Sequence, residues 1–304
     1  MKSINYLLTC MIGIFSLALT SCKKEIAEPA ANEPAIMSTT TNGPICGPVR
    51  FRKHEWGVFT YTTTIMQKWY TNDRISNITF DFFGGRHSWG LYRGELEHRM
   101  PWGEVWYAGN QLYVKEVQKD LIVFRATLDA SGKALATYYY NPHDPYNEVF
   151  TYDTLYYYYS GDRLDSVIRL NKRRHVMPTI HYSWEKYRFV YDSLGNIAGI
   201  HSVNNNSWVS FIYDYSRPVR GIVAHYDLTI PFKIAEYLDL VKLPMHYVID
   251  NIVTAPPGTV NPGSPYFNNY TITNGLVYAY HNAANDYIFG KSYYTDWGCK
   301  TSSE

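Results

Sequence analysis

The chain has 304 residues, of which 46% are hydrophobic and 17% are aromatic, and 30 of them are tyrosines. This length and apolar share allow one large domain, or two smaller ones, with a sizeable core. The chain contains 28 Lys and Arg residues against 27 Asp and Glu residues, so it lacks the positive charge typical of nucleic-acid-binding proteins. The one basic run, Lys172 to His175, falls at an expected hairpin tip, and we predict no nucleic-acid partner.

Residues 1–21 have the features of a bacterial signal peptide. Lys2 supplies the positive start, and Leu7 to Leu19 form an apolar core that is too short to cross a bilayer as a helix. The run Leu19-Thr20-Ser21-Cys22 resembles a lipobox, in which the cysteine is lipidated and becomes the first residue of the mature protein. The resemblance implies a lipid on Cys22 that attaches the protein to a membrane.

Residues 22–45 are predicted to be a disordered tether. They are mostly Ala, Glu, Pro, Thr and Asn, with little apolar surface to bury. The run Lys23-Lys24-Glu25 resembles the charged signals that direct Bacteroidetes lipoproteins to the outer membrane. We therefore expect an outer-membrane lipoprotein, and whether it faces the periplasm or the cell surface stays open.

The remaining residues, 46–304, are expected to form a single domain with a cysteine near each end, Cys46 and Cys299. An exported protein lies in a compartment that permits disulfides, so we predict that these two cysteines pair. Closing a loop of about 250 residues would stabilise the fold by about 5 kcal/mol in the chain-entropy model. The alternative is two free thiols, since neither cysteine has the spacing of a zinc ligand.

The first part of this domain is predicted to contain strands near residues 58–65, 75–83, 104–107, 112–117 and 121–128. The doublet Trp-Gly recurs along the chain, at Trp89 and Trp102 among other positions. A tryptophan beside a chain reversal could present a flat ring to a sugar, which makes Trp89 and Trp102 candidate ligand-stacking residues. The alternative interpretation is that these rings belong to the core.

The central part of the chain repeats a unit in which a tyrosine, a turn and a short aliphatic strand follow one another. The turns contain Gly, Asp, Asn and Ser, and the flanking residues are aromatic or β-branched, which is typical of hairpins. The clearest copies begin at Tyr159, Tyr191 and Tyr213. This pattern predicts an all-β fold, an antiparallel β-meander of hairpin repeats that forms either an extended sheet or a closed barrel.

These Tyr-Asp units resemble the tyrosine–aspartate repeats of the Rhs type. They are more similar to uncharacterised Bacteroidetes lipoproteins built as a long antiparallel β-meander, some described as porin-like small barrels. The segment from Ile230 to Leu238, followed by Leu243-Pro244, resembles the Pro-Phe insert of such lipoproteins. The likeness covers about residues 50–298 and implies a fold, whereas no activity is assigned to that family.

Two aromatic segments raise the question of which strand face is buried. The segment 150–159 carries tyrosine on both faces, which predicts a central strand that is covered on both sides. In the next segment, Ile180, Tyr182 and Trp184 share one face, and Tyr187, Phe189 and Tyr191 share the other. Since side chains alternate along a strand, a bulge near residues 185–186 would be needed if both sets faced the same core.

One short helix is predicted at about residues 231–241. Thr229 can cap it, Pro231 suits its first turn and Pro244 ends it. Its apolar residues fall on one stripe. A lone amphipathic helix in a β protein is expected to plug a barrel mouth or to cover an open sheet edge.

No catalytic or cofactor-binding motif is present: there is no nucleophile elbow, zinc-protease helix, phosphate loop or dinucleotide fingerprint. The best acid–base or metal candidates are His143 and Asp144 near Glu148 and Asp153. Glu95 and Glu97 could form a carboxylate pair of the glycosidase kind, but one strand face would carry both. We therefore expect no catalytic residues, no metal and no cofactor.

These observations favour a non-enzymatic, membrane-anchored lipoprotein that binds a polysaccharide, a peptide or a partner protein of the envelope through its aromatic surface. Two alternatives stay open. One is a carbohydrate-active hydrolase whose carboxylates come together only in the fold, and the other is a purely structural envelope protein.

Overall fold

The computed structural model describes residues 45–56, 61–71, 74–80, 102–117, 120–141, 150–174, 180–224, 226, 228–259, 267–282 and 290–300. The chain divides into residues 1–43 and 44–304, and every described residue lies in the second part. The signal peptide, the lipidation site Cys22 and almost all of the tether therefore lie outside the described residues, and so does Trp89.

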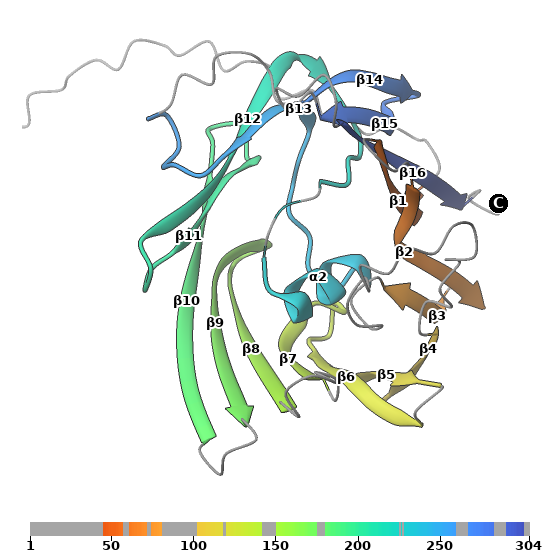
Figure 1. The fold of residues 1–304 in the computed structure, drawn as a ribbon, viewed down its shortest axis with the longest axis vertical. Helices are drawn as coiled ribbons and strands as arrows, with labels where there is room; N and C mark the ends of the chain where they lie inside the picture. The colour runs from red at the N-terminus through yellow and green to blue at the C-terminus, as the bar shows by residue number, and fades with distance from the viewer. Residues whose placement is uncertain are drawn as a thin grey trace, which may run out of the picture. The chain divides into compact units, whose positions relative to one another are not determined.

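The described residues form one antiparallel sheet of 16 strands and one helix (Figure 1), which confirms the predicted all-β meander. The elements are β1 Ile45–Trp56, β2 Tyr61–Thr71, β3 Arg74–Phe80, β4 Trp102–Ala108, β5 Gln111–Glu116, β6 Leu121–Leu128, β7 Ala134–Asn141, β8 Phe150–Ser160, β9 Arg163–Arg174, β10 Ile180–Tyr191, β11 Ile197–Ser202, β12 Ser207–Pro218, α2 Ile230–Tyr237, β13 Tyr247–Val253, β14 Phe267–Thr273, β15 Leu276–Asn282 and β16 Gly290–Lys300. No helix among the described residues combines the length and the hydropathy needed to cross a membrane.

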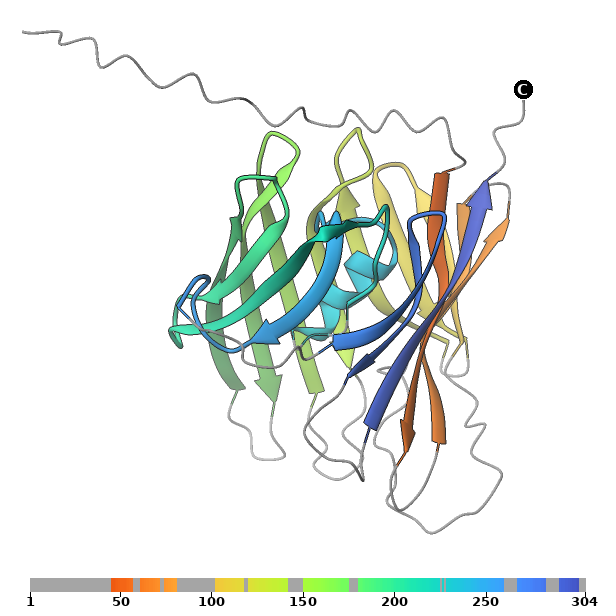
Figure 2. The same cartoon turned by 90° about the horizontal axis from the view of Figure 1, so that it is seen from above.

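Strands that follow one another in the chain lie side by side from β1 to β13 and from β14 to β16. The last strand, β16, pairs with the first strand, β1, so the two ends of the domain meet inside the sheet. Figure 2 shows the blue C-terminal strands beside the orange N-terminal strands. The sheet order therefore leaves β13 and β14 as its two edges.

The segment that follows β12 contacts elements near both edges. The backbone N–H of Val219 donates to the carbonyl of His246, just before β13, at 2.8 Å. Gly221 forms a bridge with Leu276 of β15, and its carbonyl accepts a hydrogen bond from Val277 N at 3.1 Å. The Tyr270 hydroxyl of β14 also donates to the carbonyl of Ile249 in β13. The edge strands β13 and β14 therefore contact each other, but among the described residues no ladder of backbone hydrogen bonds pairs them.

Glycine is required at position 221 because a Trp ring lies against it. A Cβ atom on Gly221 would lie 2.8 Å from the ring of Trp297, which itself donates from Nε1 to the carbonyl of Val277 at 2.9 Å. This Trp-Gly tryptophan is half-buried and packs against the segment that follows β12. At this one position the core interpretation of the Trp-Gly doublets is therefore correct.

Two of the three repeat units form the predicted hairpin turns. Gly161 and Gly195 have φ angles of +59° and +84°, which suit glycine in the left-handed region. In the second unit, Asp192 Oδ1 accepts hydrogen bonds from the backbone N–H groups of Leu194 and Asn196, at 2.9 and 2.8 Å. The aspartate of the Tyr-Asp pair thus closes the turn that follows it.

The third unit departs from the prediction, because Tyr213 to Arg217 remain within strand β12. Here the aspartate, Asp214, accepts from Ser216 N at 3.0 Å and forms an irregularity in the β12–β13 register in place of a hairpin. No glycine stands between the two apolar runs of this unit, so the chain has no residue at which to reverse cheaply.

The repeat tyrosines have a common role that the sequence pattern did not reveal. Each hydroxyl donates to a backbone carbonyl at the first or second residue of an earlier strand. Tyr159 donates to Ala134 at 3.0 Å, Tyr191 to Leu164 at 2.7 Å and Tyr213 to Ile197 at 2.7 Å. Burial raises the pKa of Tyr191 to about 12, so its hydroxyl stays a donor throughout the physiological range.

Helix α2 lies against the inner side of the sheet, where it contacts β7 and β8 (Figure 1). Its Phe232 is 1% exposed and stacks on Tyr157 and Phe189, with ring centroids 6.2 and 5.6 Å away. The apolar residues of the strands turn towards the same interior, so the sheet and helix share one core. The lone helix thus fills the inside of the curved sheet.

The helix is shorter than the predicted span of residues 231–241. It ends at Tyr237, because Asp239 adopts a φ angle of 61° that a right-handed helix cannot contain. Thr229 occupies the predicted N-cap position, but its hydroxyl makes no capping hydrogen bond. The helix is therefore held by its buried face more than by its caps.

Two expectations about strand faces need comment. The prediction that β8 is covered on both sides is wrong, since Tyr152, Tyr156 and Tyr158 of its outer face are 37–48% exposed. In β10 the register with β9 is continuous from Ile180 to Arg188, without the bulge that a shared core would have required. Aromatic residues on these strands therefore occur on both an inner and an outer face.

Replacing Phe232 by alanine should lower the free energy of unfolding by about 3–5 kcal/mol, because it removes the ring that fills the space between helix and sheet. Urea unfolding followed by tyrosine fluorescence would measure the change. The matched control is Tyr182→Ala, since this ring is 73% exposed and its loss should cost less than about 0.5 kcal/mol. Equal losses for both variants would contradict the assignment of α2 to the core.

Candidate functional site

Of the two residues predicted to stack on a ligand, Trp89 and Trp102, the structure describes only the backbone of Trp102. The backbone of Trp102 begins strand β4, but its side chain, like the whole of Trp89, lies outside the described residues. His143, Asp144 and Glu148 are also outside them, as are Glu95 and Glu97. Among the residues that are described, no group of three or more His, Cys, Asp or Glu side chains could hold a metal ion.

A row of aromatic and basic side chains crosses the outer face of the sheet from β4 to β10. Each member stands opposite the next in the strand register, from Trp106 in β4 to Trp184 in β10. We call this set the outer row; its members are Trp106, Tyr113, Arg125, Tyr138, Thr154, Leu170 and Trp184. Such cross-strand neighbours lie close enough to contact one another.

Contacts within the outer row are of two kinds. The rings of Trp106 and Tyr113 stack with their centroids 5.2 Å apart and their planes at 9°. The guanidinium carbon of Arg125 lies 4.1 Å from the centroid of the Tyr138 ring, a close cation–π contact. At the far end, the Trp184 side chain is 58% exposed. The row therefore holds some of its rings in fixed orientations while presenting others to solvent.

A second row runs parallel to the first, two residues along strands β7 to β10. Tyr140, Tyr152, Lys172 and Tyr182 stand opposite one another in the register. We call this set the lysine row. Tyr140 and Tyr152 stack at 4.7 Å, and Lys172 Nζ lies 5.9 and 5.7 Å from the centroids of the Tyr152 and Tyr182 rings. The ammonium group thus sits between two tyrosines on the flanking strands.

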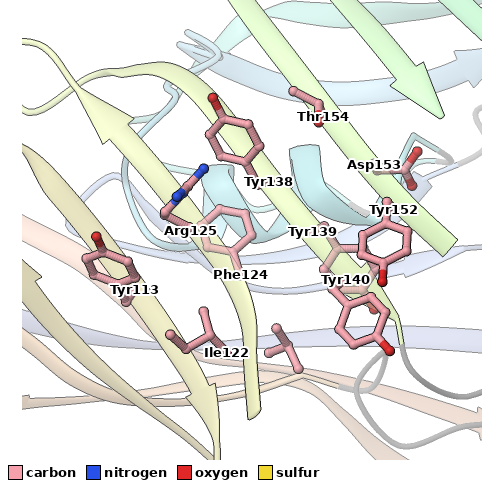
Figure 3. A pocket seen from close by; sticks show the side chains of 11 residues that line it. Tyr113, Ile122, Phe124, Arg125, Tyr138, Tyr139, Tyr140, Tyr152, Asp153 and Thr154 are labelled. Atoms are coloured by element: carbon pink, nitrogen blue, oxygen red, sulfur yellow. The ribbon is translucent and has the colours of Figure 1, made fainter. Parts of the chain in front are cut away.

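Between the two rows lies a shallow groove of about 230 Å³ on strands β5 to β8 (Figure 3). Side chains of both rows line it, and Figure 3 shows Tyr113, Arg125 and Tyr138 on one part and Tyr140 with Tyr152 on another. Ile122, which is 46% exposed, adds an apolar surface. Burial and the adjacent Tyr152 raise the pKa of Tyr140. Five of the eleven residues that line the groove are tyrosines, whose rings carry hydroxyl groups at their edges.

The inner face of strands β8 to β10 carries a different arrangement, centred on Arg169. The guanidinium donates to both carboxylate oxygens of Asp153, at 2.8 and 3.1 Å, and to Glu185 Oε2 at 3.1 Å. Asn171 Nδ2 donates to Asp153 at 2.6 Å, and the Tyr187 hydroxyl donates to Glu185 at 2.5 Å. Both carboxylates are therefore engaged by one cation and by neutral donors.

This network does not have the properties that a glycoside hydrolase requires. Such an enzyme needs one carboxyl group that remains protonated beside a second, ionised one. Burial alone would raise the pKa of Glu185, but the hydrogen bonds from Tyr187 and Arg169 and the charge of Arg169 together lower it. Among the described residues, the carboxyl group with a strongly raised pKa is Glu236 in helix α2: burial raises its pKa to about 7, and buried Tyr226 donates to it at 2.8 Å. It belongs to the core side of the molecule and lines no described groove.

The sequence pointed to aromatic contact surfaces, but it named Trp89 and Trp102, whose side chains lie outside the described residues. The outer row and the lysine row combine residues from as many as seven strands, so no local motif contains them. The one available signal was strand alternation: Tyr152, Tyr156 and Tyr158 share a face, as do Tyr182 and Trp184. Alternation alone could not show which exposed rings are neighbours, because this depends on the register that pairs the strands.

Comparison with known proteins adds a likeness in fold. No family model matches the chain, and no curated protein matches it either. The crystal structure of a porin-like protein from Bacteroides vulgatus ATCC 8482 is similar, with a TM-score of 0.51 and 14% identity, covering 83% of this chain and 98% of that one. A porin-like protein from Bacteroides uniformis ATCC 8492 has 13% identity with the same coverage, and a TM-score of 0.42. The first likeness supports the porin-like β-meander expected from the sequence.

The Arg169 network should make stability depend on acidity in a defined direction. Because the folded state lowers the pKa of Glu185 below its usual 4.5, its contribution should be complete above that pH and disappear as the pH falls through the folded value. We expect Glu185→Gln to lose about 1–3 kcal/mol at pH 7 and progressively less as the pH falls below 4.5, measured by urea unfolding at each pH. A difference between the two proteins that is constant from pH 7 to 3 would contradict this role.

Proposed function

We propose that this protein is a non-enzymatic lipoprotein of the outer membrane that binds a polysaccharide on the outer face of strands β4 to β10. The observation that carries the proposal is the pair of parallel rows, in which tyrosine and tryptophan rings from consecutive strands lie side by side. A lipid on Cys22 would attach the chain to the membrane, and residues 22–45 would serve as the tether. Residues 46–304 would then act as one binding domain.

A polysaccharide suits this surface for reasons of shape and chemistry. A sugar ring has an apolar face that packs on an aromatic ring, and hydroxyl groups at its edge that need hydrogen-bond partners. Tyrosine offers a broad apolar ring with a polar tip, which meets both needs. Four consecutive strands at a spacing of about 4.8 Å give the lysine row a length of about 14 Å. A chain of several sugars could therefore lie across the strands.

The direction in which the side chains point favours a lipid anchor. A sheet that crossed a membrane by its strands would present an apolar band outwards and a polar interior. Here many of the large apolar side chains turn inwards, including Phe51, Phe80 and Phe124, which are at most 1% exposed. The outer face of β6 to β10 carries cations such as Arg125 and Lys172. An Arg or Lys on a lipid-facing strand costs about 2–4 kcal/mol at mid-membrane.

The predicted pairing of Cys46 with Cys299 remains part of this proposal. The two residues face each other directly in the register of β1 and β16. Cα atoms of opposed residues in an antiparallel pair lie about 4.5–5.5 Å apart, a distance that a disulfide can bridge. An oxidised pair would lock the junction between the first and last strands.

Non-reducing peptide mapping of the exported protein should recover the peptides of Cys46 and Cys299 as one cross-linked species. Cys46→Ser together with Cys299→Ser should lower the melting temperature, because the unfolded chain regains the entropy of a long open loop. The matched control is reduction of the native protein, which should lower the melting temperature to a similar degree. Alkylation of both thiols without prior reduction would contradict the pairing.

The binding proposal predicts that loss of exposed rings weakens polysaccharide binding without unfolding the protein. Trp184→Ala combined with Tyr182→Ala should reduce the affinity for a bound polysaccharide by at least about fivefold, measured by affinity gel electrophoresis of the full-length protein in detergent. Tyr294→Ala is the matched control, since this 38% exposed ring belongs to β16. If the native protein is retained on none of a broad set of neutral and acidic polysaccharides, the proposed function is wrong.

A further inference from the structure

We propose that the outer face of strands β6 to β10 selects an acidic polysaccharide, one whose sugar rings carry carboxylate or sulfate groups. This inference rests on the proposed function and specifies the chemical class of its ligand. Two observations carry it. These five strands contain more Lys and Arg than Asp and Glu, and the cations of their outer face contact tyrosine rings instead of carboxylates.

Positive charge is concentrated on strands β6 to β10, although the chain as a whole is almost neutral. Their sequences contain eight Lys or Arg residues and only three Asp or Glu residues. Two of the three acids, Asp153 and Glu185, bind Arg169 on the inner face, and the third, Asp165, is exposed where the register of β8 and β9 shifts. The described outer face of these strands therefore has a surplus of cations.

The Lys and Arg side chains on the outer face contact aromatic rings, whereas surface cations are often paired with carboxylates. Arg125 lies over the Tyr138 ring, and Lys172 lies between the rings of Tyr152 and Tyr182. Within the described part of the chain, no carboxylate contacts either cation. The rings orient these groups but leave their charge unneutralised.

Two more cations extend the same face along β10. Lys186 stands opposite Ile168, which in turn stands opposite the exposed Tyr156, and Arg188 is related in the same way to Tyr158 through Ser166. Neither side chain forms an ion pair with a described carboxylate. Exposed rings and cations without a carboxylate partner therefore share the outer face of β8 to β10.

This combination of rings and cations on one face matches the chemistry of an acidic polysaccharide. Each sugar of such a polymer has an apolar ring face beside an anionic group, so a ring and a cation held next to each other can contact both parts at once. Lys172 is the best placed, because a tyrosine flanks it on either side at less than 6 Å. A neutral polymer would leave these cations unused, and an acidic one would neutralise them.

The test compares one polymer in two charge states. The full-length protein in detergent is run through gels that contain polygalacturonate, the same polymer with its carboxyl groups methyl-esterified, or dextran sulfate. We expect the native protein to bind the acidic polymers about five- to tenfold more tightly than the ester. Raising the salt concentration from about 50 to about 500 mM should reduce this preference, because salt screens the attraction between the cations and the acidic polymer.

Variants that remove a charge and variants that remove a ring should have different effects on binding. Lys172→Gln should abolish most of the preference for the acidic polymers while leaving retention by the ester unchanged, whereas Tyr182→Ala should weaken retention by every polymer. Lys242→Gln is the matched control, because Lys242 is an exposed cation that follows helix α2 and lies off the sheet. Melting curves would show that each variant remains folded.

Three results would overturn the inference. Equal retention by polygalacturonate and its ester would show that the cations do not select, while the proposed polysaccharide binding would stand. Tighter binding of single-stranded DNA than of any polysaccharide would show a general affinity for polyanions. Retention by none of the polymers would remove both the inference and the proposed function. Preference for dextran sulfate over polygalacturonate would support the class and identify sulfate as the group preferred.

Discussion

The fold depends on hydrogen bonds that reach from one hairpin unit to the one before it. Tyr159, Tyr191 and Tyr213 each donate a buried or half-buried hydroxyl to the carbonyl at the start of an earlier strand. A sheet ladder fixes neighbouring strands, but these side-chain bonds also fix the position of each turn relative to the previous unit. That constraint explains why the repeat retains tyrosine: phenylalanine could fill the same space but would leave a buried carbonyl without its partner.

Strand alternation then gives tyrosine a second use on the same strands. In β8, Tyr157 and Tyr159 point inwards: Tyr157 stacks on Phe232, and the Tyr159 hydroxyl donates a hydrogen bond to the carbonyl of Ala134. Tyr152, Tyr156 and Tyr158 point outwards and remain exposed. One residue type thus builds the core on one face and a wet, ring-lined surface on the other, because its ring is apolar and its tip is polar. The register of the strands then places the outer rings in rows.

Sequence reasoning predicted the all-β meander and the helix near Pro231, because strand period, turn residues and the helical stripe are local signals. It predicted the wrong environment for β8. Both faces of this strand carry tyrosine, so the sequence shows no difference in hydrophobicity between the buried and the exposed face. It also missed the outer row, since Trp106, Tyr138 and Trp184 belong to one row only through the register of seven strands. The turn at Tyr213 was mistaken for a hairpin because its Asp and Ser residues were right, although the glycine was missing.

The separation of charge between the two faces follows from the same geometry. Arg169 lies on the inner face, so burial requires it to have carboxylate partners, and it takes both Asp153 and Glu185. This leaves the outer face of the same strands with hardly any acid to neutralise Arg125 and Lys172, which rest on tyrosine rings instead. A protein that needed only a soluble outer surface would gain from interspersed charges of both signs. The one-sided arrangement is better explained by a ligand that brings the missing negative charge.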